Sequence, residues 1–339
     1  MDSNRGLNFQ KELVDISNVI LNRNSYPGEL LKHTHVLFTE LEKINSVESF
    51  RHATVDAVIL ESGKAIDPFS AAHCLIDYCR TTRFMRALYD AVLEAKTRFS
   101  KKPIHIFYAG TGPYASLMLP LTTRFSPDEI QFSMVEVHPI TFEMLKSTLN
   151  TLGFEKYVKN YINQDACTIR LSDYDDVHII ITETMQAALK KEPQVSITHF
   201  LAPQLQKGGI FIPEQIHVWA GLIKSTGNSN SGELNGVSRE KINRLATLIN
   251  LDPYSIEDNP IEFAEICIPI SNEMKLNYQY LNLYTEIVMF KDNILNICDS
   301  GLTMPRQIIN FKTANPLIHE VKFQYQINAE STGFNVSFN

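Results

Sequence analysis

The sequence lacks three features that would narrow its function at once. It has no apolar run long enough to cross a bilayer. Its N-terminus has no apolar core of signal-peptide length. It also has no basic excess, because 31 Lys and Arg stand against 38 Asp and Glu, giving a net charge of −7. A general nucleic-acid binder carries a basic stripe, so that class is excluded. We expect a cytoplasmic protein that binds neither membranes nor nucleic acids.

Cysteine is scarce and scattered. The five cysteines form neither a Cys-x-x-Cys pair nor a Cys/His cluster with metal-ligand spacing. Such a set indicates reduced, mostly buried thiols, and we expect no metal site. The composition is otherwise that of an ordinary globular protein, with 44% hydrophobic residues in 339 positions. That length allows two domains.

The pattern of apolar residues changes twice along the chain. Residues 1–60 have apolar positions three and four apart, which predicts helices. Segment 61–213 starts with a helix and then alternates strand and helix, which predicts a Rossmann-like parallel sheet covered on both faces. Segment 214–339 has short apolar runs between turns, which predicts a mainly antiparallel, barrel-like β domain. Within it, a polar loop and a helix-like piece at 238–251 form a candidate arm, 224–257. The predicted fold class is α/β with this appended β domain.

The alternating segment has a tight glycine turn after its first strand, 103–109. Gly110 and Gly112 stand in the turn, and an apolar helix follows. Strand, glycine turn and helix are typical of a nucleotide-type site in a doubly wound sheet. Near the end of the next strand, 131–137, Glu136 stands at the distance expected of an acid that binds ribose hydroxyls. Two glycines alone are a weak signal, but Glu136 points to the same chemistry.

Acidic residues also follow the third and fourth strands. Asp165 and Ala166 come after the third, where an acid beside a backbone amide either reads an adenine edge or belongs to a turn. Glu183 ends the fourth strand, 177–182, and Glu192 stands nine residues later with no Pro or Gly between. These two carboxylates either hold a cation from two sides or belong to a solvated surface helix. Their place in a predicted nucleotide-binding sheet favours a cation site.

A strong helix is expected from Asp67, a plausible N-cap followed by Pro68, through about residue 96. It carries Asp77 and Arg80 three positions apart and therefore on one face. The two side chains either pair with each other, or Arg80 lies beside an anion site.

Four segments, taken in order, resemble the protein arginine methyltransferases, which are class I S-adenosyl-L-methionine-dependent methyltransferases. They are DYCRT at 77–81, the GTG turn, TETMQAALKKE at 182–192 and LQKGGIFIP at 205–213. The first is similar to the family's DxxRT stretch, the second to its cofactor loop and the third to its double-E loop. The fourth is similar to LKPGGxxxP. The resemblance covers roughly residues 60–220.

The resemblance implies both a cofactor and a substrate. The cofactor is S-adenosyl-L-methionine, with contacts from Arg80, Gly110, Gly112, Glu136, Asp165 and Ala166. Catalysis and substrate binding fall to Glu183 and Glu192, which grip a guanidinium, with Met185 as a further substrate contact. Asp77 is expected to bridge to the second domain. No metal is implied.

The chain departs from the family on the substrate side. ESGKA at 61–65 stands where the family has an aromatic YFxxY motif, and no THW motif is found, although a turn at 300–305 is in a position to replace it. We therefore expect a substrate unlike a protein tail, namely free L-arginine or a small guanidino compound. Bacterial arginine methyltransferases of natural-product pathways look like the nearest relatives.

Three alternatives stay open at this point. They are methylation of protein arginine, methylation of another small nucleophile, and a non-catalytic scaffold that binds the cofactor. The family dimerises through an arm in its second domain, so the resemblance also implies a homodimer, with 224–257 as the candidate arm.

Overall fold

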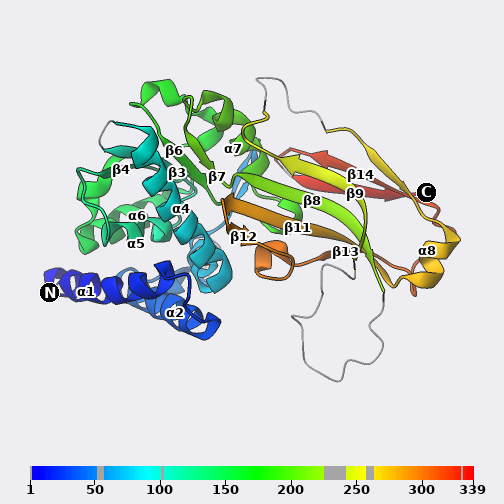
Figure 1. Ribbon diagram of the computed structural model, residues 1–339, viewed down its shortest axis with the longest axis horizontal. Coiled ribbons are helices and arrows are strands. Elements are labelled where there is room, and N and C mark those ends of the chain that lie inside the picture. Colours follow the sequence, from blue (N-terminus) through cyan, green and yellow to red (C-terminus); the bar gives the residue numbers. More distant parts are fainter. Residues whose placement is uncertain (1, 52–56, 101–102, 225–241, 257–262, 330) are drawn as a thin grey trace.

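A computed structural model describes residues 2–51, 57–100, 103–224, 242–256, 263–329 and 331–339. The chain forms an α/β lobe and a β-rich lobe that lie side by side, with the N-terminal helices against the α/β lobe (Figure 1). The predicted α/β class with an appended β domain is confirmed.

The N-terminal segment forms a helical hairpin made of α1 (Asp2–Leu21) and α2 (Pro27–Ile44). The hairpin packs on helices of the α/β lobe, and it buries Leu13, Ile16 and Ile20 completely or nearly so. The buried Arg86 guanidinium donates to the carbonyl oxygens of Ile20 (2.6 Å) and Asn22 (2.8 Å). It therefore satisfies carbonyls that the end of α1 leaves without helical partners.

The α/β lobe contains a five-stranded sheet in the order β5-β4-β3-β6-β7, and every neighbouring pair is parallel. Its strands are β3 (Ile104–Ala109), β4 (Ile130–Val135), β5 (Val158–Ile162), β6 (Ile179–Thr182) and β7 (Ile210–Ile212). The helices between them are α5 (Leu119–Thr122), α6 (Pro139–Leu152) and α7 (Gln194–Leu201). The alternation expected from the sequence is confirmed except between β5 and β6, where the chain forms two 3₁₀ turns, Ala166–Thr168 and Leu171–Asp173, in place of an α-helix.

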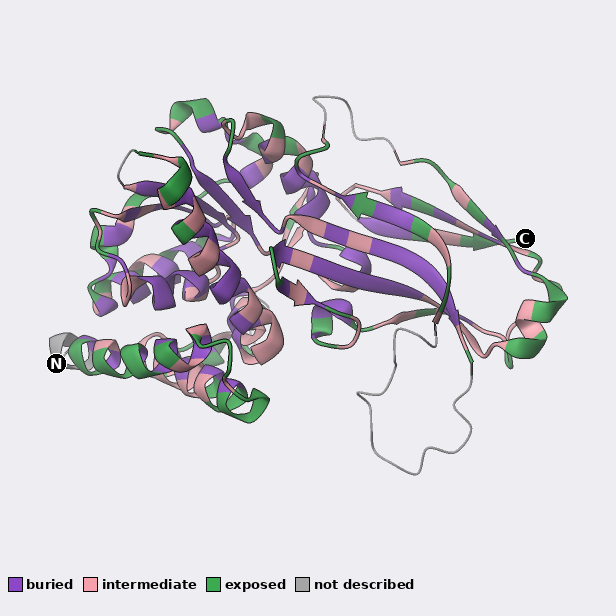
Figure 2. Ribbon diagram, viewed as in Figure 1, coloured by how far each residue is buried: buried purple, intermediate pink, exposed green. Residues whose placement is uncertain are grey.

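The order of the strands creates a switch point. From β3 the chain moves to β4 and β5 on one side, then crosses to β6 and β7 on the other. In open parallel sheets, ligands bind beyond the carboxyl ends of the strands at such a point. All residues of β3 and β6 are buried, so this part of the sheet is a rigid base (Figure 2).

The helix expected from residue 67 is interrupted. It divides into α3 (Pro68–His73), a 3₁₀ turn at Cys74–Ile76 and α4 (Tyr78–Arg98). Asp77 leaves the helical region with ψ at 88°, and its carboxylate accepts from the Arg80 N–H (3.2 Å) as the N-cap of α4. The prediction of one unbroken helix is wrong, because the Asp77 side chain caps the start of a second helix, α4.

The β-rich lobe is antiparallel, as predicted. One sheet has the order β12-β11-β8-β9 with β13 beside β11, and the other has the order β10-β14-β15. The strands are β8 (Gln215–Ile223), β9 (Ile242–Leu251), β10 (Ile266–Pro269), β11 (Tyr280–Phe290), β12 (Asn293–Leu295), β13 (Arg306–Asn310), β14 (Glu320–Gln326) and β15 (Gly333–Phe338). A short helix, α8 (Asn272–Asn277), lies at the far end of this lobe (Figure 1). A small hairpin, β1 (Val58–Leu60) and β2 (Gly63–Ala65), precedes α3 in the chain.

The prediction of a helix at 238–251 is wrong. Ile242–Leu251 forms β9, which pairs with β8 from Ile223↔Ile242 to Ile216↔Leu251. Its apolar spacing suits a helix or a strand, and a long-range partner decides between them. The part of the candidate arm at 225–241 lies outside the described residues, while β9 belongs to the main sheet of the lobe.

Two compositional expectations can be compared with the structure. All five cysteines are free thiols, as expected. Four are half-buried and Cys267 is exposed, so the expectation that the thiols are mostly buried is wrong. Among the described residues, no helix combines the length and apolar character needed to cross a bilayer.

Candidate active site

A cavity lies at the switch point, beyond the carboxyl ends of β3, β4 and β6. Its wall includes these predicted site residues: Arg80, Gly110, Gly112, Glu136, Asp165, Ala166, Glu183 and Glu192. Met185 is the exception, because it is 2% exposed within the main hydrophobic core and is not among the described residues that line the cavity. The structure therefore brings together residues that lie more than 100 positions apart.

The glycine turn is fitted closely to the end of β6. Gly110 has φ at +78°, and a Cβ there would lie 2.4 Å from Cγ2 of Thr184. Only glycine combines this backbone conformation with so close an approach. The turn therefore lies directly against the loop that carries Glu183.

Glu136 is fixed by backbone donors. Its Oε2 accepts from the Gly112 N–H (3.1 Å), and its Oε1 accepts from the His138 N–H (2.9 Å). Burial raises the pKa of Glu136 to about 7, and these two hydrogen bonds oppose that shift. The carboxyl group is thus held at the cavity wall in one orientation.

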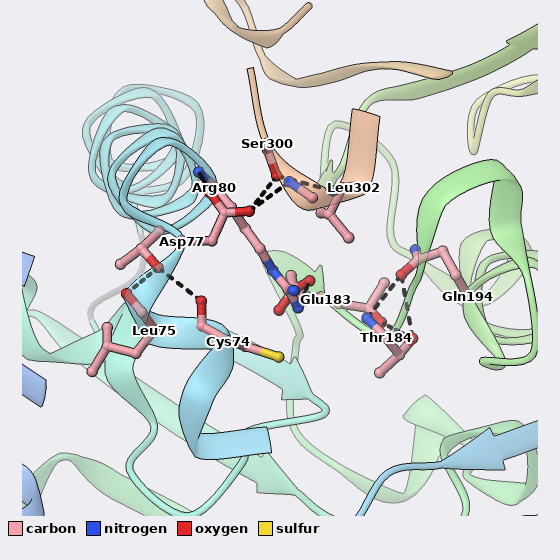
Figure 3. Close-up of polar contacts among 12 residues, drawn as sticks. Cys74, Leu75, Asp77, Arg80, Glu183, Thr184, Gln194, Ser300 and Leu302 are labelled. Carbon is pink, nitrogen blue, oxygen red and sulfur yellow. Dashed lines mark hydrogen bonds and ion pairs between the residues drawn. The ribbon is translucent and has the colours of Figure 1, made fainter. Parts of the chain in front are cut away.

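Arg80 and Glu183 form an ion pair inside the cavity. Figure 3 shows the Arg80 side chain reaching from α4 to Glu183, with Nη2 paired to Oε1. The two side chains are 12% and 13% exposed. Burial alone would lower the pKa of Arg80, but the adjacent Glu183 carboxylate outweighs it and the pKa lies above its ordinary value. This wall of the cavity therefore already holds a guanidinium group, that of Arg80.

Glu192 supplies a second carboxyl group nearby. Burial raises the pKa of Glu192 to about 7, and the charge of Glu183 adds to the shift. Burial also raises the pKa of Glu183, while Arg80 opposes that shift. Cys74 lies beside the same groups, and burial raises the pKa of its thiol to about 11, so it stays neutral (Figure 3). Two acids thus share a region in which Arg80 is a nearby cation.

The loop from Glu183 to Glu192 is not the surface helix that the sequence left open as an alternative. Ala188, Leu189 and Lys191 have φ at 56°, 54° and 67°, in the left-handed region that side chains disfavour. Such strain persists only where the surroundings over-determine the conformation. Glu192 is 7% exposed, so the loop presents its second acid to the interior.

The cavity wall also carries uncharged polar side chains, among them Thr111 and Gln164. Thr111 Oγ1, in the glycine turn, is buried without a hydrogen-bond partner among the described residues. Over the same part of the chain, no group of three or more His, Cys, Asp or Glu is placed to hold a metal ion.

Comparisons with known proteins bear on the fold. Neither a family model nor a curated protein sequence matches the chain. The structure is similar to the PRMT1 enzyme–prozyme complex of Trypanosoma brucei with AdoHcy, with a TM-score of 0.50 and 14% identity over 80% of this chain and 99% of that one. It is also similar to protein arginine methyltransferase 10 of Arabidopsis thaliana, with a TM-score of 0.53 and 13% identity over 80% and 96% of the two chains.

The fold is that of the protein arginine methyltransferases. At these identities the likeness establishes the architecture, and the roles of individual residues rest on the geometry of this chain.

Within this arginine methyltransferase fold, Asp77 joins the two lobes. Its Oδ2 accepts from the Ser300 hydroxyl (2.7 Å) and from the Gly301 N–H (2.8 Å) (Figure 3). The bridge that the resemblance implied for Asp77 is therefore present. The turn suggested as a replacement for the THW motif makes it with a hydroxyl and a backbone amide. The bridge contains no histidine.

The segment that replaces the aromatic YFxxY motif is the β1–β2 hairpin. The Ser62 hydroxyl in its turn donates to Asp165 Oδ2 (2.9 Å), and Asp165 Oδ1 accepts from the Cys167 N–H (2.9 Å). Sequence reasoning missed Ser62, because its partner lies 103 residues away and no local pattern marks the contact. It also missed Thr111, although its place between two glycines was a signal.

Proposed function

We propose that this protein is an S-adenosyl-L-methionine-dependent N-methyltransferase that methylates a guanidino nitrogen, most simply that of free L-arginine or a small guanidino compound. One observation carries the proposal. Two carboxyl groups stand at the switch point beside the glycine turn: Glu192 is buried, and Glu183, whose side chain is 13% exposed, is already paired with the guanidinium of Arg80.

The chemistry of a guanidinium explains the need for two acids. Its pKa lies above about 12 and its planar fork offers five N–H donors, so it arrives charged and needs acceptors in fixed directions. Carboxylates of Glu183 and Glu192 accept such donors in bidentate geometry and draw positive charge toward the nitrogens they hold. The remaining nitrogen is then more nucleophilic and fixed in position. Positioning of this kind supplies a large part of the rate in a transfer reaction.

The residues of the cavity fit the proposed cofactor. Arg80 offers a cation for its carboxylate, Glu136 offers acceptors for ribose hydroxyls, and Asp165 with Ala166 lies where the adenine is expected. Thr111 adds a buried hydroxyl without a partner among the described residues, as a polar ligand would require. When bound, S-adenosyl-L-methionine supplies an electrophilic methyl group.

Glu183 has two possible partners under this proposal. Without ligands it pairs with Arg80, and the proposed cofactor offers Arg80 a carboxylate of its own. If Arg80 held that carboxylate, Glu183 would be free to accept from the substrate, so we expect the guanidino substrate to bind more tightly in the presence of the cofactor than in its absence.

The size of the substrate is the second part of the proposal. The hairpin that replaces the aromatic motif contributes Leu60 and Ala65 to the cavity wall, which supports a small substrate. A protein arginine substrate is the second candidate. It is favoured because both structural neighbours are protein arginine methyltransferases. The cytoplasmic location, the homodimer and a role in natural-product biosynthesis stay predictions from the sequence.

An assay with defined acceptors tests the proposal. The purified protein is incubated with S-adenosyl-L-methionine and either free arginine or arginine-rich peptides, and the products are identified by mass. We expect methylated free arginine. Turnover of peptides alone would replace the first candidate by the second, and cofactor binding without any turnover would indicate a scaffold.

The pH dependence of substrate binding follows from Glu192. Its pKa of about 7 in the free protein lies above the ordinary value for a glutamate, so below pH 7 the group is mostly protonated and must lose a proton to hold a cation. With saturating cofactor, we expect the KM for the guanidino substrate to fall as pH rises through about 7 and to level off above it. Steady-state kinetics between pH 5.5 and 9 measure this change in KM. A KM that rises across the range would contradict the role of Glu192.

A further inference from the structure

The loop that carries Glu192 is held from both sides at one residue, Lys191, through the two peptide groups that flank its Cα. Its N–H donates to the Thr332 carbonyl oxygen (2.8 Å) in the β-rich lobe. Its carbonyl oxygen accepts from the Lys64 N–H (2.8 Å) in the β1–β2 hairpin. Lys191 has φ at 67° and immediately precedes Glu192, so these two bonds restrain the backbone that places the acid.

The hairpin fits the loop closely at Gly63. A Cβ on Gly63 would lie 2.9 Å from the Lys191 carbonyl oxygen and 3.0 Å from the Pro193 nitrogen. Both are backbone atoms, so no flexible side chain can move aside. Gly63 also has φ at +139°, a conformation that only glycine adopts readily. Any side chain at this position therefore displaces the backbone on either side of Glu192.

The β-rich lobe adds two contacts on the other side of the loop. The Tyr325 hydroxyl on β14 donates to the Leu189 carbonyl oxygen (2.6 Å), and the Ala188 N–H donates to Thr285 Oγ1 on β11 (3.0 Å). Tyr325 is 3% exposed, and the two loop residues in these contacts, Leu189 and Ala188, both have left-handed backbone conformations. These bonds stabilise a backbone conformation that the loop would not keep by itself.

The same hairpin is tied to the cofactor side of the cavity. The Ser62 hydroxyl donates to Asp165, and the Ser62 carbonyl oxygen accepts from the Ser196 hydroxyl on α7 (2.9 Å). The turn at 61–64 therefore makes two contacts: Ser62 binds Asp165, and the Lys64 N–H binds the Lys191 carbonyl oxygen just before Glu192.

We propose that Gly63 and Tyr325 are positioning residues that hold the Glu192 loop from opposite sides, so that the hairpin and the β-rich lobe together fix the geometry of the acid pair. The expected loss of kcat/KM rests on the proposed function. The expected loosening of the loop does not. Loosening either contact frees the loop, moves Glu192 and leaves the Glu136 side of the cavity in place.

Two variants, Gly63→Ala and Tyr325→Phe, test this from the two sides. Gly28→Ala is the matched control, because a Cβ there meets nothing within 4 Å. Hydrogen exchange followed by mass spectrometry over residues 183–193 reports the order of the loop without any substrate. We expect exchange to be at least about tenfold faster in both variants than in the wild type and in Gly28→Ala.

Kinetics then separate positioning from general damage. For both variants we expect kcat/KM for the guanidino substrate to fall at least about tenfold, because small displacements of a holding group are costly. For Tyr325→Phe, which does not touch the hairpin, we expect the dissociation constant of the cofactor product and the melting temperature to stay close to wild type.

The outcomes are distinguishable. If Gly63→Ala fails to fold, Tyr325→Phe decides the question. Wild-type exchange and wild-type kcat/KM in Tyr325→Phe would overturn the inference. The variants could show fast exchange while the wild-type protein methylates no guanidino compound. That result would support the positioning role and overturn the proposed function.

Discussion

Glu192→Gln is expected to lower kcat/KM for the guanidino substrate by on the order of 10²-fold. The change keeps the size of the side chain and removes the charge that we propose holds the substrate. Hydrogen bonds to charged groups contribute about 1.5–3 kcal/mol each, which corresponds to roughly one to two decades. Glu192 is 7% exposed, so water cannot take its place freely. Steady-state kinetics with detection by mass measure the loss.

Cofactor binding supplies the internal check for Glu192→Gln. We expect calorimetry to give a dissociation constant for the cofactor product within about threefold of wild type, because the proposed cofactor contacts come from other residues, Arg80, Glu136 and Asp165 among them. Glu143→Gln is the matched control, since Glu143 is an exposed glutamate on α6 that pairs with Lys146 at the surface. A parallel loss of cofactor affinity in Glu192→Gln would argue against a substrate role.

Arg80→Met is expected to destabilise the protein by an amount that grows with pH. The variant leaves Glu183 and Glu192 buried without their cation, and removing one partner of a buried ion pair costs about 3–5 kcal/mol. Without Arg80, the pKa of Glu183 rises further above its unfolded value. The folded state then binds more protons than the unfolded state above pH 4.5, so stability falls as pH rises. Protonation of the acids relieves the cost at low pH.

Urea unfolding at pH 5.5 and pH 8 measures this effect. We expect the stability difference between wild type and Arg80→Met to be larger at pH 8. Arg98→Met is the matched control on the same helix, because Arg98 is 37% exposed and pairs with Glu94 near the surface. Equal differences at the two pH values would contradict the account of the buried pair. Affinity for the cofactor should also fall by at least about tenfold if Arg80 binds its carboxylate.

The cofactor side of the cavity was predictable because its signals are local. A strand followed by Gly110 and an acid at the end of the next strand specify the sheet, the turn and the edge at which Glu136 lies. Parallel strands place their carboxyl ends along one edge, so Glu183 had to share that edge. The end of α6 is likewise local, because Gly153 caps the helix with φ at 70°.

The substrate side was less predictable because long-range contacts decide it. Residues 242–251 have a spacing that suits two structures, and pairing with β8 selects the strand. The conformation of the Glu192 loop depends on Tyr325 and on the β1–β2 hairpin, which carry no recognisable local motif. Met185 was assigned to the substrate by its place in the loop, yet it packs into the core.

By itself, the sequence determined the class of the fold and the residue types at the ends of the strands, since periodicity, glycine turns and helix caps act over a few residues. Only the tertiary structure decided the surroundings of Glu183 and Glu192. It buried Glu192, left the Glu183 side chain only 13% exposed and placed the Arg80 guanidinium against it. It also set the backbone before Glu192 between the β1–β2 hairpin and the β-rich lobe. The reason is physical. Charge and burial depend on groups that the chain brings together from far apart, and the pKa of a carboxyl group follows from those groups.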